Sequence, residues 1–394
     1  MNFIPAQMGR LNKRALLGQL QKAGQASRAG LAKALGMSQP TAGRIVDELL
    51  EQGVLEEVDT PPAGSEGLAA GEESGPRLGR PGRLLQLDRT RPRFLGIQLG
   101  IAETRLAELP VGADSKDRWQ IRFATPNQGS NPAKQWLREL KAAAGKIRRT
   151  EFWGVLVSVP GIVDEPVCRV VFSPNLHWTE SVDLPRLIRG IWDAPVLLVQ
   201  EERALALGHQ QANPHGEDFL LVDFGDGVGG AMIVQGKPYA NPLPISGELG
   251  HTPVLGNRRP CGCGAVGCVE TLVSTRGLLE SFAAAQPKKS HTWPALIRHL
   301  NGSGIPPWLA EALDAAANTI AGALNVLGLR RVVITGSLTE LPPMVVKHLS
   351  QAVQKGAMWA RFGKIECESA PRRRTAGLVA AGIDQLVTPI EGSE

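Results

Sequence analysis

Residues 246–251 read SGELGH and residues 261–270 read CGCGAVGCVE, and these two segments decide the interpretation of the chain. They place one imidazole and three thiols within eighteen positions: His251, Cys261, Cys263 and Cys268. Three thiolates and one imidazole fill a tetrahedral zinc site and leave no position for a reactive water. The glycines between the cysteines allow the tight turns that such near neighbours need. We therefore expect a structural Zn²⁺ site, the alternative being three buried, reduced cysteines in a loop.

Two carboxylates, Glu248 and Glu270, bracket this cluster. The Gly-Glu-Leu-Gly-His motif and the cysteine block that follows it resemble the ROK family (repressors, open reading frames and kinases), whose members bind sugars in a cleft between two lobes. The resemblance implies that Glu248, His251 and Glu270 bind sugar hydroxyls and that His251 also ligates zinc. Charged acceptors suit this role because a sugar hydroxyl donates strong hydrogen bonds to them. The alternative is that the two glutamates are solvated surface charges.

Length and composition agree with an ordinary globular protein. The chain has 394 residues, 43% of them hydrophobic and 21% charged, which predicts two or three domains. No apolar run approaches the length of a membrane span, and the N-terminus lacks the apolar segment of a signal peptide. Five cysteines, mostly in one metal-like cluster, argue against a disulfide scaffold and for a reducing compartment. We expect a cytoplasmic protein.

The first 46 residues contain seven Lys or Arg residues and no acidic one, although the net charge of the whole chain is only +5. Apolar spacing predicts helices at 11–23, from Ser27 to Leu35, and from Ser38 to about Gly53, with a tight turn between the last two. This is the pattern of a helix-turn-helix. We expect the last helix to turn four side chains away from its buried stripe and toward a major groove: Gln39, Thr41, Ala42 and Arg44.

Strands are predicted at 54–58 and 83–87, and they would pair as a wing. Residues 59–82 between them are rich in Gly, Pro, Ala, Ser and Glu, which predicts a flexible wing tip. Arg80 and Arg83 lie on a Gly/Pro-extended segment that suits a narrow minor groove. This head resembles the DNA-binding domain of ROK repressors; the alternative is a helical oligomerisation module. Its predicted DNA contacts are Ser38, Gln39, Thr41, Arg44, Arg80 and Arg83.

From residue 93 onward, strands and helices alternate in a pattern that predicts two α/β lobes of the actin-like, ribonuclease H-like type. We expect residues 1–92 to form the winged helix-turn-helix domain, residues 93–200 with the closing helix 372–388 the first lobe, and residues 201–371 the second lobe with the zinc site. The segment SPNLHW at 173–178 resembles the family segment whose asparagine binds sugar, which implies that role for Asn175 and suggests that Trp178 packs on the sugar.

The kinase motifs of the family are altered at four places. Residues 98–102 read QLGIA where family enzymes have Asp-[Ile/Leu]-Gly-Gly-Thr, and the second phosphate loop at 225–230 reads GDGVGG, with Asp226 facing the position of a triphosphate. The catalytic Asn-Asp pair is Gln200-Glu201, and the adenosine-side glycines are Gly336-Ser337-Leu338. Phosphoryl transfer depends on positioning, so we predict no kinase activity.

The sequence therefore predicts a sugar-responsive transcriptional repressor, a non-enzyme that contains zinc. Its partners would be a double-stranded operator, an inverted repeat bound by a homodimer or homotetramer, and a sugar or sugar phosphate effector. Two alternatives stay open: an ATP-dependent sugar kinase with an appended DNA-binding head, and a regulator whose sugar cleft is vestigial. The predicted sugar-binding residues are Asn175, Glu201, Glu248, His251 and Glu270.

Overall fold

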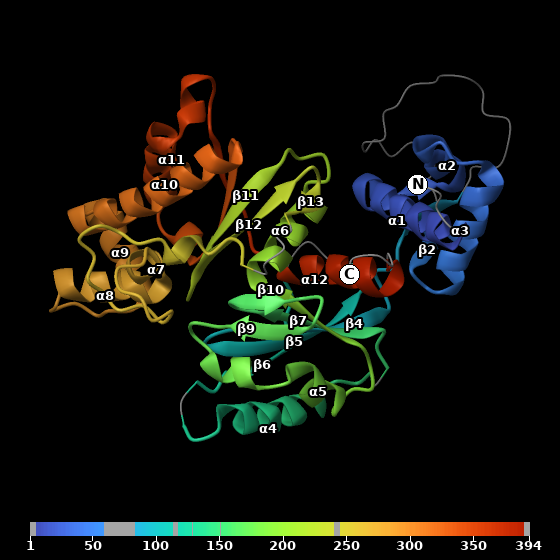
Figure 1. Cartoon of the computed structure of the whole chain (residues 1–394), viewed down its shortest axis with the longest axis horizontal. Helices are drawn as coiled ribbons and strands as arrows, with labels where there is room; N and C mark the ends of the chain where they lie inside the picture. Colours follow the sequence, from blue (N-terminus) through green and yellow to red (C-terminus); the bar gives the residue numbers. More distant parts are fainter. Residues whose placement is uncertain are drawn as a thin grey trace. The chain divides into compact units, whose positions relative to one another are not determined.

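The computed structural model of the chain divides into two compact units (Figure 1). The first comprises Met1–Pro92, Pro110–Ala113 and Ile383–Glu394, and the second comprises Arg93–Leu109 and Asp114–Gly382. The structure describes residues 5–58, 83–112, 117–127, 129–149, 151–239 and 245–389. No helix within these ranges is long and apolar enough to cross a membrane.

The first unit begins with three helices: α1 Pro5–Ala23, α2 Arg28–Leu35 and α3 Gln39–Glu51. The side chain of Ser27 caps α2 by accepting from the N–H of Gly30 at 3.0 Å, and Ser38 caps α3 in the same way. Gly36, with φ of 62°, makes the turn between them. Their core is built from buried aliphatic side chains: Leu16, Leu17, Leu20, Leu31, Ala42, Ile45, Val46 and Leu49.

Three short strands complete this unit: β1 Ala26–Ser27, β2 Leu55–Val58 and β3 Leu84–Leu87, in the antiparallel order β1-β3-β2. The β2–β3 pair confirms the predicted wing, and the predicted wing tip at 59–82 lies outside the described residues. The C-terminal π-helix Ile383–Val387 belongs to the same unit, and its Asp384 forms an ion pair with Arg14 of α1.

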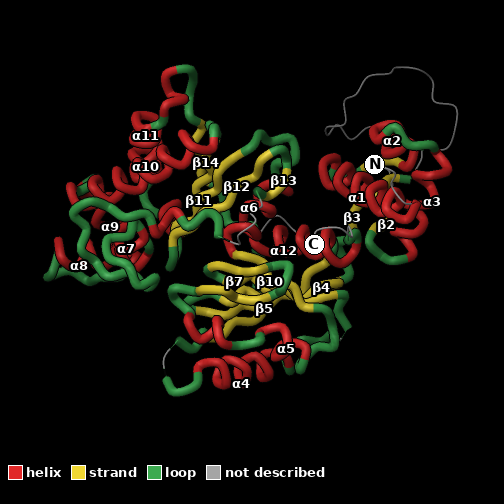
Figure 2. The backbone as a smooth tube through the Cα atoms, viewed as in Figure 1, coloured by secondary structure: helices red, strands yellow, loops and turns green. Residues whose placement is uncertain are grey.

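The second unit contains two five-stranded sheets (Figure 2). In the first sheet, the order is β10-β7-β4-β5-β6, with β10, β7 and β4 parallel. Its strands are β4 Pro92–Leu99, β5 Glu103–Pro110, β6 Ile121–Ala124, β7 Gly154–Val159 and β10 Val196–Gln200. The helix α4 Pro132–Ala144 packs on it through Trp136, which is fully buried and donates its indole N–H to Thr104 at 3.0 Å.

Around this sheet lie a small hairpin and two short helices, β8 Ile162–Asp164, β9 Arg169–Phe172, the 3₁₀ helix His177–Ser181 and α5 Leu184–Arg189. Helix α4 ends at Ala144, with Gly145 as its C-cap.

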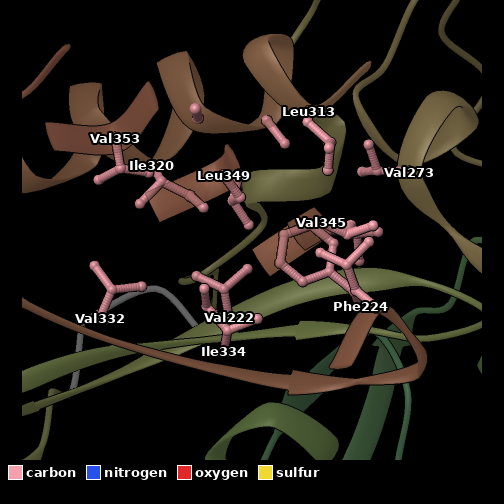
Figure 3. Packing of buried hydrophobic residues seen from close by; sticks show 14 of the residues in the cluster. Val222, Phe224, Val273, Leu313, Ile320, Val332, Ile334, Val345, Leu349 and Val353 are labelled. Atoms are coloured by element: carbon pink, nitrogen blue, oxygen red, sulfur yellow. The ribbon is translucent and has the colours of Figure 1, made fainter. Parts of the chain in front are cut away.

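The second sheet has the order β13-β12-β11-β14-β15. Its strands are β11 Phe219–Phe224, β12 Val228–Val234, β13 Lys237–Pro238, β14 Arg331–Gly336 and β15 Glu366–Ser369. The helices that follow β13 are α7 Glu270–Val273, α8 Thr275–Ala285, α9 Trp293–Ser303, α10 Pro307–Leu327 and α11 Pro343–Gly356. Figure 3 shows α10 and α11 side chains such as Ile320 and Leu349 facing Val222 and Ile334 of the sheet in a continuous apolar core.

Two helices, α6 Glu201–Ala212 and α12 Arg374–Gly382, lie between the sheets and pack closely against each other. They touch where each has a glycine: a side chain at Gly208 would collide with the backbone of Arg373, and one at Gly377 with the backbone of Ala204. This close crossing brings the N-terminal ends of both helices to the interior of the unit. The closing helix was predicted over 372–388, but the α-helical part is Arg374–Gly382 and continues as the π-helix to Val387.

Candidate functional site

The four predicted zinc ligands come together in the second unit. One ligand atom from each of His251, Cys261, Cys263 and Cys268 lies within 4.8 Å of all the others. The Cys263 and Cys268 sulfurs are 3.7 Å apart, and Cys261 Sγ is 3.5 Å from His251 Nδ1. Tetrahedral zinc, with bonds of about 2.3 Å to sulfur and 2.0 Å to nitrogen, separates its ligands by roughly 3.8 Å and 3.6 Å. The donor set and its spacing therefore fit a metal ion.

The backbone shapes this cluster. Gly264 and Gly267 both have φ of 90°, a conformation that other residues rarely adopt, and the N–H of Cys261 bonds to the carbonyl of Ala265 at 2.8 Å. Burial and hydrogen bonds among the three thiols raise the pKa of Cys268 to about 12. A bound cation would reverse this shift, because metal ligation deprotonates a thiol.

All five predicted sugar-binding residues line one cleft of about 130 Å³ in the second unit: Asn175, Glu201, Glu248, His251 and Glu270. The segment 173–175 lines the cleft and lies against the zinc loop, since a side chain at Gly262 would lie 2.6 Å from the carbonyl oxygen of Pro174. The glycine loop 225–229 lines the cleft as well. The motifs that are separate along the chain thus lie together in one site.

Glu248, His251 and Glu270 connect the cleft to the cysteines. His251 directs Nδ1 toward the thiols, while its Nε2 lies 3.6 Å from a Glu248 oxygen. Glu270 is 8% exposed and accepts a hydrogen bond from the N–H of Val228 at 2.9 Å. Burial, and then the charge of Glu270, raise the pKa of Glu248 to about 7. A metal ion bound to Nδ1 of His251 would orient the imidazole. Glu248 would then lie beside the other ring nitrogen, outside the coordination shell of the metal.

Glu201 is held by a buried arginine that sequence reasoning missed. Arg374, at the first turn of α12, is 1% exposed and bonds to a Glu201 carboxylate oxygen. Its guanidinium also lies 3.5 Å from Asp117, whose carboxylate accepts the N–H of Thr375 at 2.8 Å. Gln98 donates to Glu201 at 3.3 Å. The carboxylate at the position of the family's catalytic base is therefore the partner of a fixed positive charge.

A second arginine, Arg372, sits against the glycine segments that the resemblance assigned to nucleotide binding. It bonds Asp223 through two hydrogen bonds of 2.7 Å, and Thr335 donates to the same carboxylate at 2.7 Å. A side chain at Gly336 would lie 2.8 Å from the Arg372 guanidinium. Burial opposes ionisation of Asp223, but the charge and hydrogen bonds of Arg372 outweigh it and lower the pKa of that carboxyl. In the sequence, the run of three arginines at 372–374 was the only indication that arginines lie near the cleft.

Trp178 was predicted to pack on the sugar, and this prediction is wrong. Its ring lies 5.8 Å from that of Trp136 and packs against the core of the first sheet, and it is absent from the cleft lining. Aromatic side chains bury large apolar areas, and the nearby core provides a better place for this indole than the polar cleft does.

On the head, Gln39 and Arg44 are exposed on α3, and Thr41 is half-buried. The hydroxyl of Ser38 accepts the Thr41 N–H and lies 2.8 Å from the Thr41 hydroxyl, so the two form the helix cap. Ala42, predicted to face outward, is instead fully buried, because positions 42, 45, 46 and 49 share one face of a helix with 3.6 residues per turn.

The structure describes one of the two arginines that were predicted to contact DNA from the wing. Arg83 bonds to Glu57 across the β2–β3 pair, and its side chain keeps 66% of its surface exposed. Arg80 lies outside the described residues. On α1, Lys13 forms an ion pair with Glu48 of α3.

Comparison with known proteins agrees with both units. Residues 94–383 match the ROK family, and residues 10–56 match winged helix-turn-helix DNA-binding domains. The xylose repressor of Bacillus subtilis is 25% identical over 350 residues, covering 87% of this chain and 86% of that protein. The N-acetylmannosamine kinase of Pasteurella multocida is 25% identical over 290 residues, covering 72% of this chain and 94% of the kinase.

Among solved structures, a ROK family transcriptional regulator described as a homolog of the E. coli MLC protein has a TM-score of 0.72 at 18% identity, covering 98% of this chain and 100% of that chain. A ROK glucokinase from Streptomyces griseus, in complex with glucose and AMPPNP, has a TM-score of 0.59 at 20% identity, covering 73% of this chain and 97% of that one. These likenesses show the winged head and the two-lobed body as a shared fold. The match over residues 94–383 shows that this chain belongs to the ROK family.

Proposed function

We propose that this protein is a sugar-responsive, DNA-binding transcriptional repressor whose sensor descends from a sugar kinase. The observation that carries the proposal is the union in one chain of a winged helix-turn-helix with a ROK body whose cleft glutamate, Glu201, is paired to the buried Arg374. The similarity to xylose repressors, which extends over 87% of the chain, supports it.

In this proposal the domains are those expected from the sequence, with residues 1–92 as the DNA-binding domain, 93–200 plus 372–388 as the first lobe and 201–371 as the second. Gln39, Thr41 and Arg44 contact base edges of a major groove, while Ser38, Arg80 and Arg83 contact the backbone or the minor groove. A homodimer or homotetramer places two heads on an inverted repeat.

Zinc is the metal that the donor set favours, since soft thiolates and an imidazole at tetrahedral spacing suit it. When bound, the ion supplies a rigid cross-link between His251 and the cysteine loop. The residues of the chain then do the binding: Asn175 and Glu270 face the sugar from fixed positions, and His251 donates from its cleft-facing nitrogen. An effector changes DNA affinity only if it binds the two states of the protein with different affinity.

The absence of kinase activity is supported by the ion pairs of the cleft. A general base must be free to accept a proton, whereas the Glu201 carboxylate is hydrogen-bonded to the Arg374 guanidinium in an ion pair. Asp226 adds a carboxylate to the glycine loop, where triphosphate oxygens would lie in a kinase. Both features weaken catalysis without affecting the ability of the cleft to hold a neutral ligand.

The proposal is tested by selecting operator sequences from a random duplex pool with the full-length protein, then titrating sugars into the purified complex. We expect salt-dependent, nanomolar-range binding to an inverted repeat and a change in that affinity with at least one sugar. Failure to bind any duplex at low salt would refute the proposal.

The second candidate function is sugar phosphorylation, favoured by the similarity to N-acetylmannosamine kinases over 72% of the chain. A coupled ADP-release assay over a panel of hexoses distinguishes it, because turnover at an ordinary enzymatic rate of about 1–100 s⁻¹ is expected only of a kinase. A vestigial cleft is distinguished by a thermal-shift screen, in which a ligand at a hundredfold its Kd stabilises the fold by about 2.7 kcal/mol.

A further inference from the structure

We infer that the effector is an unphosphorylated sugar rich in hydrogen-bond donors, and that a free amino group on the sugar strengthens its binding. The inference rests on the proposed role of the cleft as a sugar sensor. It goes further by naming the chemical class of ligand that the cleft accepts and the class that it rejects.

The charge of the cleft is strongly unbalanced. Among the described residues, its lining contains two guanidinium groups, those of Arg105 and Arg372. Its lining contains seven carboxylates: Glu103, Glu201, Glu202, Asp223, Asp226, Glu248 and Glu270.

Both lining arginines are already committed to carboxylates. Arg105 pairs with Glu103 at 2.8 Å, and Arg372 pairs with Asp223 at 2.7 Å. A ligand phosphate would therefore have to share each guanidinium with a carboxylate that already balances its charge.

Four carboxylates remain after Glu201 is assigned to Arg374. No Lys or Arg of the described residues lies within ion-pair distance of Glu202, Asp226, Glu248 or Glu270. Burial, followed by repulsion from Glu201 and Glu248, raises the pKa of Glu202 well above its ordinary value. Burial likewise raises the pKa of Asp226, against the influence of Arg372. The cleft thus resists further negative charge and favours positive charge.

The hydrogen-bonding groups of the cleft show the same imbalance. Gln98 lines the cleft, is 8% exposed, and its Oε1 has no hydrogen-bond donor among the described residues. This buried acceptor needs a donor, and so does each carboxylate around it that is ionised. Fewer neutral side chains of the lining can donate: Gln98 and Ser173 already donate to Glu201 and Pro160, which leaves Asn175 and His251. A sugar hydroxyl or ammonium supplies donors, whereas an ionised phosphate supplies acceptors almost exclusively.

The test uses the full-length, metal-replete protein and matched sugar series in the gluco, galacto and manno configurations. Each series compares the parent hexose, the 2-amino sugar at a pH where the amine is protonated, and the 6-phosphate, at constant ionic strength by isothermal titration calorimetry. In the configuration that binds best, we expect the amino sugar to bind at least tenfold more tightly than the parent, and the 6-phosphate at least tenfold more weakly. The inference is overturned if the 6-phosphate binds as tightly as the parent sugar or more tightly, or if the amino sugar binds no more tightly than the parent.

A pair of variants assigns the preference to charge in the cleft. Asp226 makes no side-chain hydrogen bond to a described residue, so Asp226→Asn removes one charge with little structural cost. We expect it to reduce the amino-to-parent affinity ratio at least threefold. Glu311→Gln, which removes one charge from the exposed face of α10, should leave the ratio unchanged. An equal ratio in both variants contradicts the charge argument.

These outcomes also separate the inference from the proposed function. Tighter binding of a phosphorylated sugar, with a response at the operator, would leave the repressor proposal intact and overturn only the ligand class. No binding of any sugar, with operator binding unaffected, would remove the sensor role and the inference together.

Discussion

Replacing Arg374 by methionine is the perturbation whose effect the structure defines most closely. The side chain is 2% exposed, and its partners Glu201 and Asp117 are 14% and 15% exposed, so all three groups are largely removed from water. Removal of one partner from a buried ion pair costs about 3–5 kcal/mol, because the remaining charge has lost its compensation.

The lower part of that range is expected here. After the substitution Asp117 keeps the backbone and hydroxyl hydrogen bonds of Thr375. Most of the cost therefore comes from Glu201, whose remaining donor among the described residues is the Gln98 amide. Nε of Arg374 has no acceptor among the described residues, which further limits what the native arrangement contributes. We expect a loss of about 3 kcal/mol for Arg374→Met, measured by urea unfolding.

A double-mutant cycle tests the pair directly. Because methionine at both positions removes both charges, Arg374→Met with Glu201→Met should recover most of the loss, giving a coupling energy of at least about 2 kcal/mol. The matched control is Arg276→Met, an arginine 85% exposed and paired with Glu280, where the expected cost is below about 0.5 kcal/mol. A cost for Arg374→Met no greater than that of the control, or additive effects in the cycle, would refute the reasoning.

Three further predictions follow from the metal cluster, the head and a buried carboxylate. Cys263→Ser should abolish stoichiometric zinc by metal analysis and lower the melting temperature, whereas full zinc content would exclude Cys263 as a ligand. Arg44→Ala should weaken binding to a selected operator by about 1–3 kcal/mol and relax base preference at one position, and an unchanged profile would remove Arg44 from the contacts. Burial opposes ionisation of Asp88, but hydrogen bonds from Thr90 and Arg91 lower its pKa overall. The ionised Asp88 therefore stabilises the fold above about pH 4, and this contribution is lost as the pH falls through the lowered pKa. Asp88→Asn should make the free energy of unfolding less dependent on pH in this acid range, as measured by circular dichroism. An acid sensitivity equal to that of the unmodified protein would contradict this prediction.

Features that depend on neighbours in the chain were predicted from the sequence. Ser27 and Ser38 cap their helices as expected because a cap needs only the next three residues. The Cys₃His cluster came together as predicted, since its ligands lie within eighteen positions and glycines supply the turns.

Features that depend on distant residues were missed. Arg372 and Arg374 find their carboxylates 149 and 173 positions away, and no local pattern indicates such pairs. Trp178 was misplaced for the same reason, because its partner Trp136 lies in α4, far from it in the sequence. The error at Ala42 was different: the helical period, continued one turn toward the N-terminus, would have placed it inside.

The pairing of Asp384 with Arg14 has a practical consequence for anyone handling the protein. Because residues from Ile383 onward belong to the same unit as the winged helix, an affinity tag or fluorophore at either terminus is attached to the DNA-binding unit. A probe meant to follow the second unit belongs at an internal site instead. The exposed turn at Lys288 and Lys289, between α8 and α9, offers a place where a single cysteine could be introduced for labelling or immobilisation.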